Sequence, residues 1–358
     1  MKYTVGHLVA RVLVILGVTL AGTTTAQSAM VATVPVGASP SGVAVSPDGT
    51  RVYVTNFFSD TVSVIDTSTN RVTSTVRVGP GPTGIAVHPD GTRLYVANLV
   101  GETISVIDTA TYRVITTLNA PAAAIAVHPD GTRLYATTRD GTNSVLVFDT
   151  ATSLRAATIP VGAAPVDLAI SPDCPLAEAL RFRAERRIFR IPCIYVANTF
   201  SSTLTIINAD TDLALTDIAV PCCPIGVAAH PSGSAVYVLN ALNDTISAID
   251  TASGQMFAVV FVGDPGGMAV SPNGARIYAT DGVNSSLLAL DADTNRVIAA
   301  VPVPGGAGRV AVSPDGTHVY VVNQRGALRV SEWVKISPYG GNYPLLELRQ
   351  HTGEYLQA

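Results

Sequence analysis

A tetrapeptide that recurs seven times constrains this chain more than any other feature of its sequence. It has the form Ser/His-Pro-Asp/Ser/Asn-Gly, except that Cys replaces the Gly in the fourth copy. The copies start at Ser46, His88, His128, Ser171, His230, Ser271 and Ser313, so the steps between them are 42, 40, 43, 59, 41 and 42 residues. Such a period indicates one small structural unit used again and again, and that unit decides the fold.

Each unit predicts four strands. In the first unit a short apolar stretch, residues 42–45, precedes the tetrapeptide, whose Pro and Gly favour a tight turn. Residues 51–56, 61–66 and 71–78 follow, with the alternation and β-branched residues typical of strands. Four strands every 42 residues or so are typical of a propeller blade. We therefore predict an all-β fold, a seven-bladed β-propeller of four-stranded antiparallel blades. A stacked solenoid is the alternative, but seven four-stranded copies fit a closed ring better.

The second strand of the unit carries a recognisable motif. It reads Tyr-Val-Thr-Asn, Tyr-Val-Ala-Asn, Tyr-Val-Ala-Asn, Tyr-Val-Leu-Asn and Tyr-Val-Val-Asn from Tyr53, Tyr95, Tyr195, Tyr237 and Tyr320. Over residues 31–333 the chain resembles the YVTN-family β-propeller repeat of bacterial and archaeal exported and surface-layer-like proteins. The resemblance implies a propeller at the cell surface or outside the cell. It implies little about activity, because one fold hosts many functions.

The two ends of the repeat region predict how the ring closes. The last unit has strands near residues 309–313, 317–323 and 327–333 but no fourth, whereas residues 31–36 read like a fourth strand without a unit. We predict that residues 31–36 form the outer strand of the seventh blade, so that one N-terminal strand closes the ring. Residues 334–358 depart from the repeat and predict an irregular C-terminal tail.

The first 27 residues predict a signal peptide. Lys2 and Arg11 precede an apolar run, residues 12–21, and small polar residues follow. The run is too short to span a bilayer, which needs about 20 residues. We expect an exported protein that is periplasmic, attached to the cell surface or secreted, with no transmembrane segment after the signal is removed.

The amino-acid composition limits which kinds of partner the protein is expected to bind. Charged residues are 13% of the chain, too few for a disordered or coiled-coil protein. The net charge of −4 gives no general attraction to nucleic acid. We expect a monomer that binds a protein or cell-envelope component and has no specific nucleic-acid partner.

Function should lie where the copies differ, because repeated residues serve the geometry of every blade. The three His of the tetrapeptide and the Asn and Asp that end the second and third strands therefore predict turn hydrogen bonds, not a metal site. Two residues before the repeated Ala of the first strand, the copies read Gly42, Gly84, Ala124, Asp167, Gly226, Gly267 and Arg309. Small residues there indicate crowding near the axis.

The two charged residues in that series, Asp167 and Arg309, are candidate ligand-binding residues at the mouth of the central channel. They are either two solvated charges, joined through water, or groups that orient a polar ligand. Asp264 and Asp281 are further acids that we place on the channel side.

The 59-residue step between the fourth and fifth tetrapeptides is the longest one. It contains an insertion in the fourth blade, residues 174–193, in place of a tight turn. Cys174 follows one strand and Cys193 precedes the next, so in an exported protein we expect a disulfide between them. The insertion is basic, with Arg181, Arg183, Arg186, Arg187 and Arg190. It predicts a solvated arm, with docking of an acidic surface as the alternative.

The other two thiols, Cys222 and Cys223, are adjacent in a blade-to-blade connection on the opposite face. If they are oxidised, they form a strained disulfide. The alternative is a thiol pair that binds a metal or takes part in redox chemistry.

Two functions follow from this pattern. The first is a binding scaffold without a cofactor or metal, which recognises its partner through variable loops between second and third strands: residues 57–60, 99–102, 139–143, 199–202, 241–244 and 282–285. The alternative is an enzyme at the channel mouth, because related propellers include lactonases, lyases and hydrolases. No nucleophile elbow, phosphate-binding loop or HExxH motif is present. We therefore favour the scaffold and assign no catalytic residue.

Overall fold

The computed structural model describes residues 10–16, 30–173 and 191–323. They form strands only, arranged in seven four-stranded antiparallel sheets. The insertion that we expected at 174–193 and the tail at 334–358 lie almost wholly outside these residues.

Six of the sheets are each built from four consecutive strands. Their inner strands are β3 (Pro40–Val45), β7 (Pro82–Val87), β11 (Ala122–Val127), β15 (Pro165–Ser171), β19 (Pro224–Ala229) and β23 (Met268–Val270). The second strands are β4 (Arg51–Asn56), β8 (Arg93–Asn98), β12 (Arg133–Thr138), β16 (Cys193–Asn198), β20 (Ala235–Asn240) and β24 (Arg276–Asp281). The third strands are β5 (Thr61–Asp66), β9 (Thr103–Asp108), β13 (Ser144–Asp149), β17 (Thr203–Asn208), β21 (Thr245–Asp250) and β25 (Ser286–Asp291). The outer strands are β6 (Arg71–Arg77), β10 (Arg113–Asn119), β14 (Arg155–Pro160), β18 (Leu213–Ala219), β22 (Met256–Phe261) and β26 (Arg296–Pro302).

The seventh sheet corrects the predicted closure. Its order is β2-β1-β28-β27, where β1 is Ala10–Leu16, β2 Met30–Val36, β27 Ala307–Val312 and β28 His318–Asn323. The prediction of a blade closed by one N-terminal strand is therefore wrong, because the N-terminal region supplies two strands.

The unexpected strand is β1, which takes the third position. It pairs with β28 on one side and β2 on the other, with Val12 opposite both Val322 and Val34. We expected residues 327–333 in this position, but they lie outside the described residues. A third strand needs a run of apolar and β-branched residues, and residues 10–16 supply one inside the predicted signal peptide.

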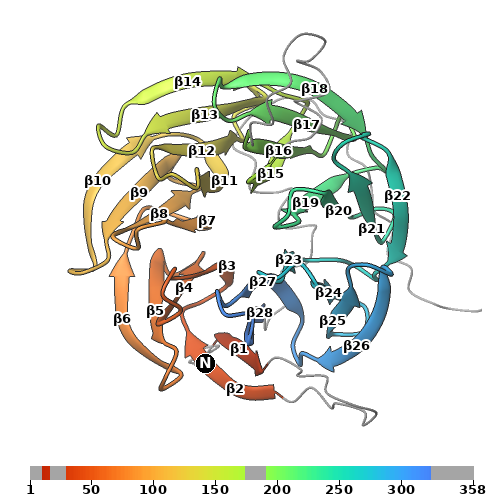
Figure 1. Cartoon of the computed structure of the whole chain (residues 1–358). Coiled ribbons are helices and arrows are strands. Elements are labelled where there is room, and N and C mark those ends of the chain that lie inside the picture. The colour runs from red at the N-terminus through yellow and green to blue at the C-terminus, as the bar shows by residue number, and fades with distance from the viewer. Residues whose placement is uncertain (1–9, 17–29, 174–190, 324–358) are drawn as a thin grey trace, which may run out of the picture. The chain divides into compact units, whose positions relative to one another are not determined.

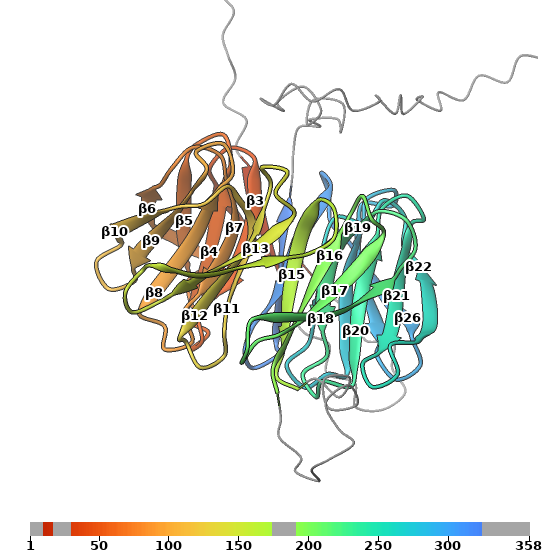
Figure 2. The ribbon, with the colours of Figure 1, turned by 90° about the horizontal axis from the view of Figure 1, so that it is seen from above.

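The sheets stand around a common axis (Figure 1). The inner strands contact one another in the order β3, β7, β11, β15, β19, β23, β27 and back to β3. Figure 2 shows the same strands from the side. Neighbouring sheets bury an apolar cluster between them; for example, Tyr53 and Val64 of the first sheet pack with Leu94, Val96 and Ile107 of the second. The second and third strands are buried on both faces, so the core lies midway between axis and rim.

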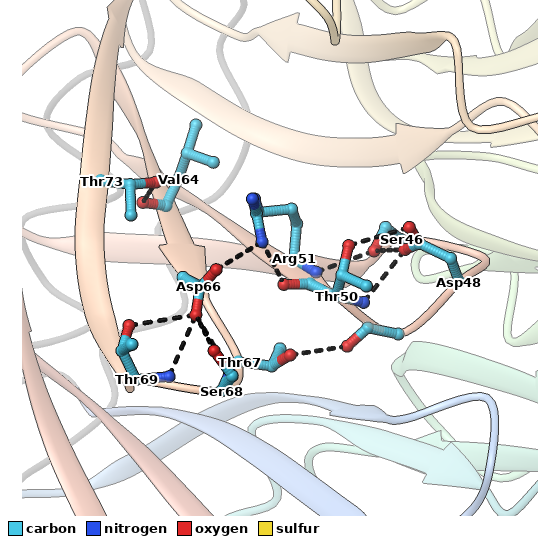
Figure 3. Close-up of polar contacts among 11 residues, drawn as sticks. Ser46, Asp48, Thr50, Arg51, Val64, Asp66, Thr67, Ser68, Thr69 and Thr73 are labelled. Atoms are coloured by element: carbon cyan, nitrogen blue, oxygen red, sulfur yellow. Dashed lines mark hydrogen bonds and ion pairs between the residues drawn. The ribbon is translucent and has the colours of Figure 1, made fainter.

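One face of the ring carries the turns of the tetrapeptide, and we call it the turn face. In the first copy Ser46 Oγ donates to Asp48 Oδ1 at 2.5 Å and accepts from the Arg51 amide at 2.9 Å (Figure 3). Thr67 Oγ1 donates to the Gly49 carbonyl at 2.8 Å, which ties the third-to-fourth turn to the first. Gly49 has φ 71°, the conformation that glycine adopts freely. These contacts confirm the predicted turn.

Candidate functional site

The two charged residues of the inner strands form a direct ion pair. Arg309 Nη1 on β27 donates to Asp167 Oδ2 on β15 at 3.0 Å. Two other inner strands, β19 and β23, lie between them in the ring order. The Asp167 side chain is 15% exposed and that of Arg309 40% exposed. The pair therefore links strands that are not neighbours, without the bridging water that one of our interpretations required.

Asp167 also holds the adjacent strand. Its Oδ2 accepts the Val227 amide of β19 at 3.2 Å. Elsewhere hydroxyls link neighbouring inner strands: Ser41 donates to the Pro82 carbonyl at 2.7 Å and Thr83 to the Ala123 carbonyl at 3.0 Å. Side chains therefore link neighbouring inner strands in both places. In the first sheets the link is a hydroxyl donor, and at Asp167 it is a carboxylate acceptor.

Crowding near the axis explains which copies can carry a charge. A Cβ placed on Gly42 would lie 2.2 Å from the Thr83 carbonyl oxygen, and one on Gly84 2.7 Å from that of Ala123. A Cβ on Gly226, beside Asp167, would approach nothing closer than 3.4 Å. The ring is more open at β19, and the Asp167 carboxylate lies in that space.

The structure does not add Asp264 and Asp281 to this pair. Asp264 lies in the connection between β22 and β23 and is exposed, whereas Asp281 is the last residue of β24 and is only 5% exposed. Asp281 accepts the Asn284 amide at 2.9 Å and its Nδ2 at 2.8 Å, and it stands where five of the other six second strands end in Asn. Within the described residues, no group of three or more His, Cys, Asp and Glu is placed to hold a metal ion.

The His of the tetrapeptide make turn hydrogen bonds, as expected: two of the three bond the next turn, and His128 Nδ1 accepts the Asp130 amide of its own turn at 3.3 Å. His88 Nε2 lies 2.9 Å from the Gly131 carbonyl oxygen of the next turn, and His230 Nε2 lies 3.0 Å from that of Gly274. They therefore join neighbouring turns around the ring.

The strand-ending Asn residues differ from the expectation of backbone capping. Asn56 Nδ2 donates to the hydroxyls of Thr61 and Ser63, both at 3.0 Å, and Asn98 and Asn198 make the matching pairs. Because these amides are fully buried, they fix the start of each loop from inside the blade.

The thiols separate into two regions. Cys193 is buried at the start of β16, and Cys174 and the five Arg of the insertion lie outside the described residues. Cys222 and Cys223 are free thiols whose Sγ atoms are 2.6 Å apart. Burial and the neighbouring thiol raise the pKa of Cys223 to about 11, so it stays protonated at neutral pH.

The second-to-third-strand loops share a feature that we did not predict. The second residue after the strand is large, apolar and exposed in five of them: Phe58 53%, Val100 54%, Phe200 76%, Leu242 58% and Val283 71%. We call these five side chains the apolar loop set. The third blade differs, with exposed Arg139 and Asp140 in its loop. An alignment of the loops on the preceding Asn or Asp would have revealed the pattern.

These loops lie on the face opposite the turns, together with the blade-to-blade connections. The Phe58 and Phe200 amides donate to the carbonyls of Ala38 and Ala163, at 3.3 and 3.1 Å. Likewise the Ala241 amide donates to the Cys223 carbonyl at 3.0 Å, which places Cys223 on this face. We call it the loop face.

The comparisons with known proteins support a β-propeller. The family model "Lactonase, 7-bladed beta-propeller" matches residues 43–174, which cover the first three sheets and β15. A solved chain of the Kuenenia stuttgartiensis hydrazine synthase is similar, with 22% identity and a TM-score of 0.68 over 80% of this chain and 93% of that one. No curated protein matches. At this identity the structural likeness shows the fold alone, and the YVTN resemblance stays a prediction.

Proposed function

We propose that this chain is an exported binding scaffold whose loop face recognises an apolar segment of a protein or cell-envelope partner. The observation that carries the proposal is the apolar loop set, defined above. Exposed apolar side chains that gather on one face of a soluble protein mark interaction sites. On the turn face, the described tetrapeptide turns carry polar side chains that bond one another, and the large exposed apolar residues there, such as Leu154 and Leu213, stand at or directly before the start of outer strands instead of in the turns.

The loops hold these side chains in a fixed geometry. Their last residue has nearly the same left-handed conformation in all six described loops, with φ of 52°, 51°, 51°, 52°, 51° and 48° at Asp60, Glu102, Asn143, Ser202, Asp244 and Ser285. Several of these residues also bond the following connection: Asp60 Oδ1 accepts the Gly81 amide at 2.9 Å and Asp244 Oδ1 the Asp264 amide at 3.0 Å. A fixed loop loses little freedom on binding, which favours affinity.

The apolar side chains of adjacent blades also approach one another. Phe58 packs edge-on against Phe57, with ring centroids 5.1 Å apart. A Cβ on Gly81 would lie 3.2 Å from the Phe57 ring and 2.5 Å from Val100 Cγ2, so both side chains border this glycine. Apolar side chains of the first two loops therefore lie on either side of Gly81.

A random peptide library displayed on phage tests the proposal. We expect the purified chain to enrich peptides rich in aromatic and aliphatic residues, and the triple variant Phe58→Ser, Phe200→Ser, Val283→Ser to lose this enrichment. The control carries three matched changes on outer strands or their edges, at residues of similar exposure: Ile115→Ser, Leu213→Ser and Ile298→Ser. Equal loss in both variants, or no enrichment by the parent, would reject loop-face recognition.

Export belongs to the same proposal, since residues 1–27 read as a signal peptide. Its removal takes β1 away from the seventh sheet and leaves open the third position, for which the repeat predicts residues 327–333. Cell fractionation and N-terminal sequencing test export: we expect the protein outside the cytoplasm, starting between residues 27 and 31. A cytoplasmic protein that keeps its first residues would contradict export and leave loop-face binding untouched.

An enzyme acting at the ion pair is the second candidate. It is favoured by the lactonase family match over residues 43–174, which includes Asp167. Arg309 is 40% exposed and keeps N–H groups that can hold a carbonyl or carboxylate. An assay with small γ- and δ-lactones decides this candidate: hydrolysis that falls at least tenfold in Asp167→Asn and Arg309→Met would support it. Hydrolysis unchanged by both substitutions would exclude the pair.

A further inference from the structure

The outer strand β22 differs from every other outer strand of the ring. It is the last strand of its sheet, and within the described residues no strand pairs with its outer edge. Its sequence is Met-Phe-Ala-Val-Val-Phe, with no charge, proline or glycine. Its outward side chains are strongly exposed: 54% for Phe257, 52% for Val259 and 76% for Phe261.

The strand registers allow the outer strands to be compared position by position. Phe261 corresponds to Arg77, Asn119, Pro160, Ala219, Pro302 and Pro35 in the other sheets. Val259 corresponds to Thr75, Thr117, Thr158, Asp217, Ala300 and Thr33. Proteins place charges and proline on edge strands to block edge-to-edge pairing. Four of the other six strands carry Pro or Arg at the first position and a fifth carries Asp at the second, whereas β22 has a large apolar residue at both.

The backbone of β22 has groups free to pair. The Val262 amide donates inward to the Asp244 carbonyl at 2.7 Å, and Phe261 and Val259 stand opposite Thr245 and Ser247. In an antiparallel ladder the residues alternate between inward and outward hydrogen bonding. The N–H and C=O of Val259 and Phe261 therefore point away from β21. The bulge at Phe257 is shared with the other outer strands, so it is not what distinguishes this edge.

We infer that β22 is a self-association edge that pairs antiparallel with β22 of a second copy of this chain. A two-fold axis through Val260 sets Val259 of each copy opposite Phe261 of the other. These two residue pairs make about four hydrogen bonds, two for each pair. The same axis places apolar side chains against apolar ones, because residues 258–262, which it pairs with one another, are Ala-Val-Val-Phe-Val.

The second copy fits this edge better than a charged or polar partner, because β22 offers no charge to complement one. A large side chain such as Phe presents about 200 Å², so the exposed parts of the strand sum to roughly 400 Å² per copy. Two copies bury roughly 800 Å², which is below the 1,200–2,000 Å² of a standard stable interface. The dimer is therefore weak and depends on concentration. The monomer that we expect from the sequence is the competing outcome of the experiment below.

Sedimentation velocity over a range of concentrations tests the inference on the full chain. We expect a monomer–dimer equilibrium, and Phe261→Pro should shift its midpoint at least tenfold toward higher concentration. Pro is tolerated at this position in β14 and β26, and the N–H it removes is not used inside the blade. The matched control is Ala219→Pro, the same change at the same position of β18. It should leave the midpoint unchanged.

Amide exchange identifies the edge directly. We expect the Val259 and Phe261 amides to exchange more slowly as the concentration rises, while those of Thr75 and Arg77 on β6 do not change. A parent chain that stays monomeric at every concentration would overturn the inference, as would equal shifts in Phe261→Pro and Ala219→Pro. Val259 and Phe261 amides that are already protected in dilute monomer would also overturn it and indicate that another part of the same chain covers the edge.

Discussion

The ion pair between Asp167 and Arg309 allows a quantitative prediction. Asp167→Ala removes two interactions at once, the 3.0 Å ion pair and the acceptor of the Val227 amide at 3.2 Å. Arg309→Ala removes only the ion pair and leaves Asp167 with the amide. The first substitution should therefore destabilise the fold more than the second.

The size of each effect follows from exposure. Exposed ion pairs contribute about 0.2–1 kcal/mol, while removing one partner of a fully buried pair costs about 3–5 kcal/mol. Because Arg309 is 40% exposed, solvent screens the pair, and we take the exposed limit of about 1 kcal/mol for Arg309→Ala. An unpaired amide adds about 1 kcal/mol, so Asp167→Ala should lose about 2 kcal/mol. At about 2 °C per kcal/mol in a domain of this size, the melting temperatures fall by about 2 and 4 °C.

A double-mutant cycle measures the pair itself. Urea unfolding of the parent, both single variants and the double variant should give a coupling energy of about 1 kcal/mol that shrinks in high salt. A coupling near zero would refute the reasoning, because the two charges would then be independently solvated. A single variant more stable than the parent would also refute it, and such a gain is typical of residues kept for function at the expense of stability.

Three further predictions test the fold around the site. Gly42→Ala should destabilise the chain by about 2 kcal/mol or more, because its Cβ would lie 2.2 Å from a carbonyl oxygen, whereas Gly226→Ala should change unfolding by less than about 0.5 kcal/mol. Tyr135→Phe should lose about 1 kcal/mol in urea unfolding, since its hydroxyl bonds Ala209 and Asp212 at 3.1 Å, and Tyr237→Phe, whose hydroxyl has no bond to the described residues, should lose less. The Ser313 hydroxyl, with Thr317, lowers the pKa of Asp315 to about 2; stability from this group is present above about pH 4 and lost as pH falls toward 2. Asp315→Asn should therefore flatten the fall in melting temperature over that range, and an unchanged slope would contradict the assignment.

The repeat explains why so much of the fold could be predicted. The turn at Ser46, the alternating strands and the outer position of residues 31–36 follow from local patterns, each repeated seven times. The third strand of the seventh sheet could not be predicted in this way. Residues 10–16 satisfy a signal peptide and a buried strand equally well, since both need an apolar run.

The candidate site was predictable only in part. Asp167 and Arg309 stand out because they break a series of small residues, but their distance depends on how the ring closes, which no local pattern contains. Asp281 looks like a spare acid in the sequence, yet it takes the position of the strand-ending Asn and accepts two hydrogen bonds from Asn284 in the following loop. The apolar loop set and β22 were missed because single exposed apolar residues are ordinary. The loop residues become significant only because they repeat in five loops, and those of β22 only because the other outer strands lack them.

The two faces of the ring differ in a way that supports the proposed recognition by the loop face. On the turn face, side chains such as Asp66 are saturated: its Oδ1 accepts from the amides and hydroxyls of Ser68 and Thr69, and these bonds lower its pKa to about 2. An oxygen that already accepts this many hydrogen bonds has little capacity left to bind a ligand. On the loop face the polar groups also hold the backbone, but five of the six described loops then project one apolar side chain that is more than half exposed. Because such a side chain adds little to the stability of its blade, our proposal assigns these five residues to the partner.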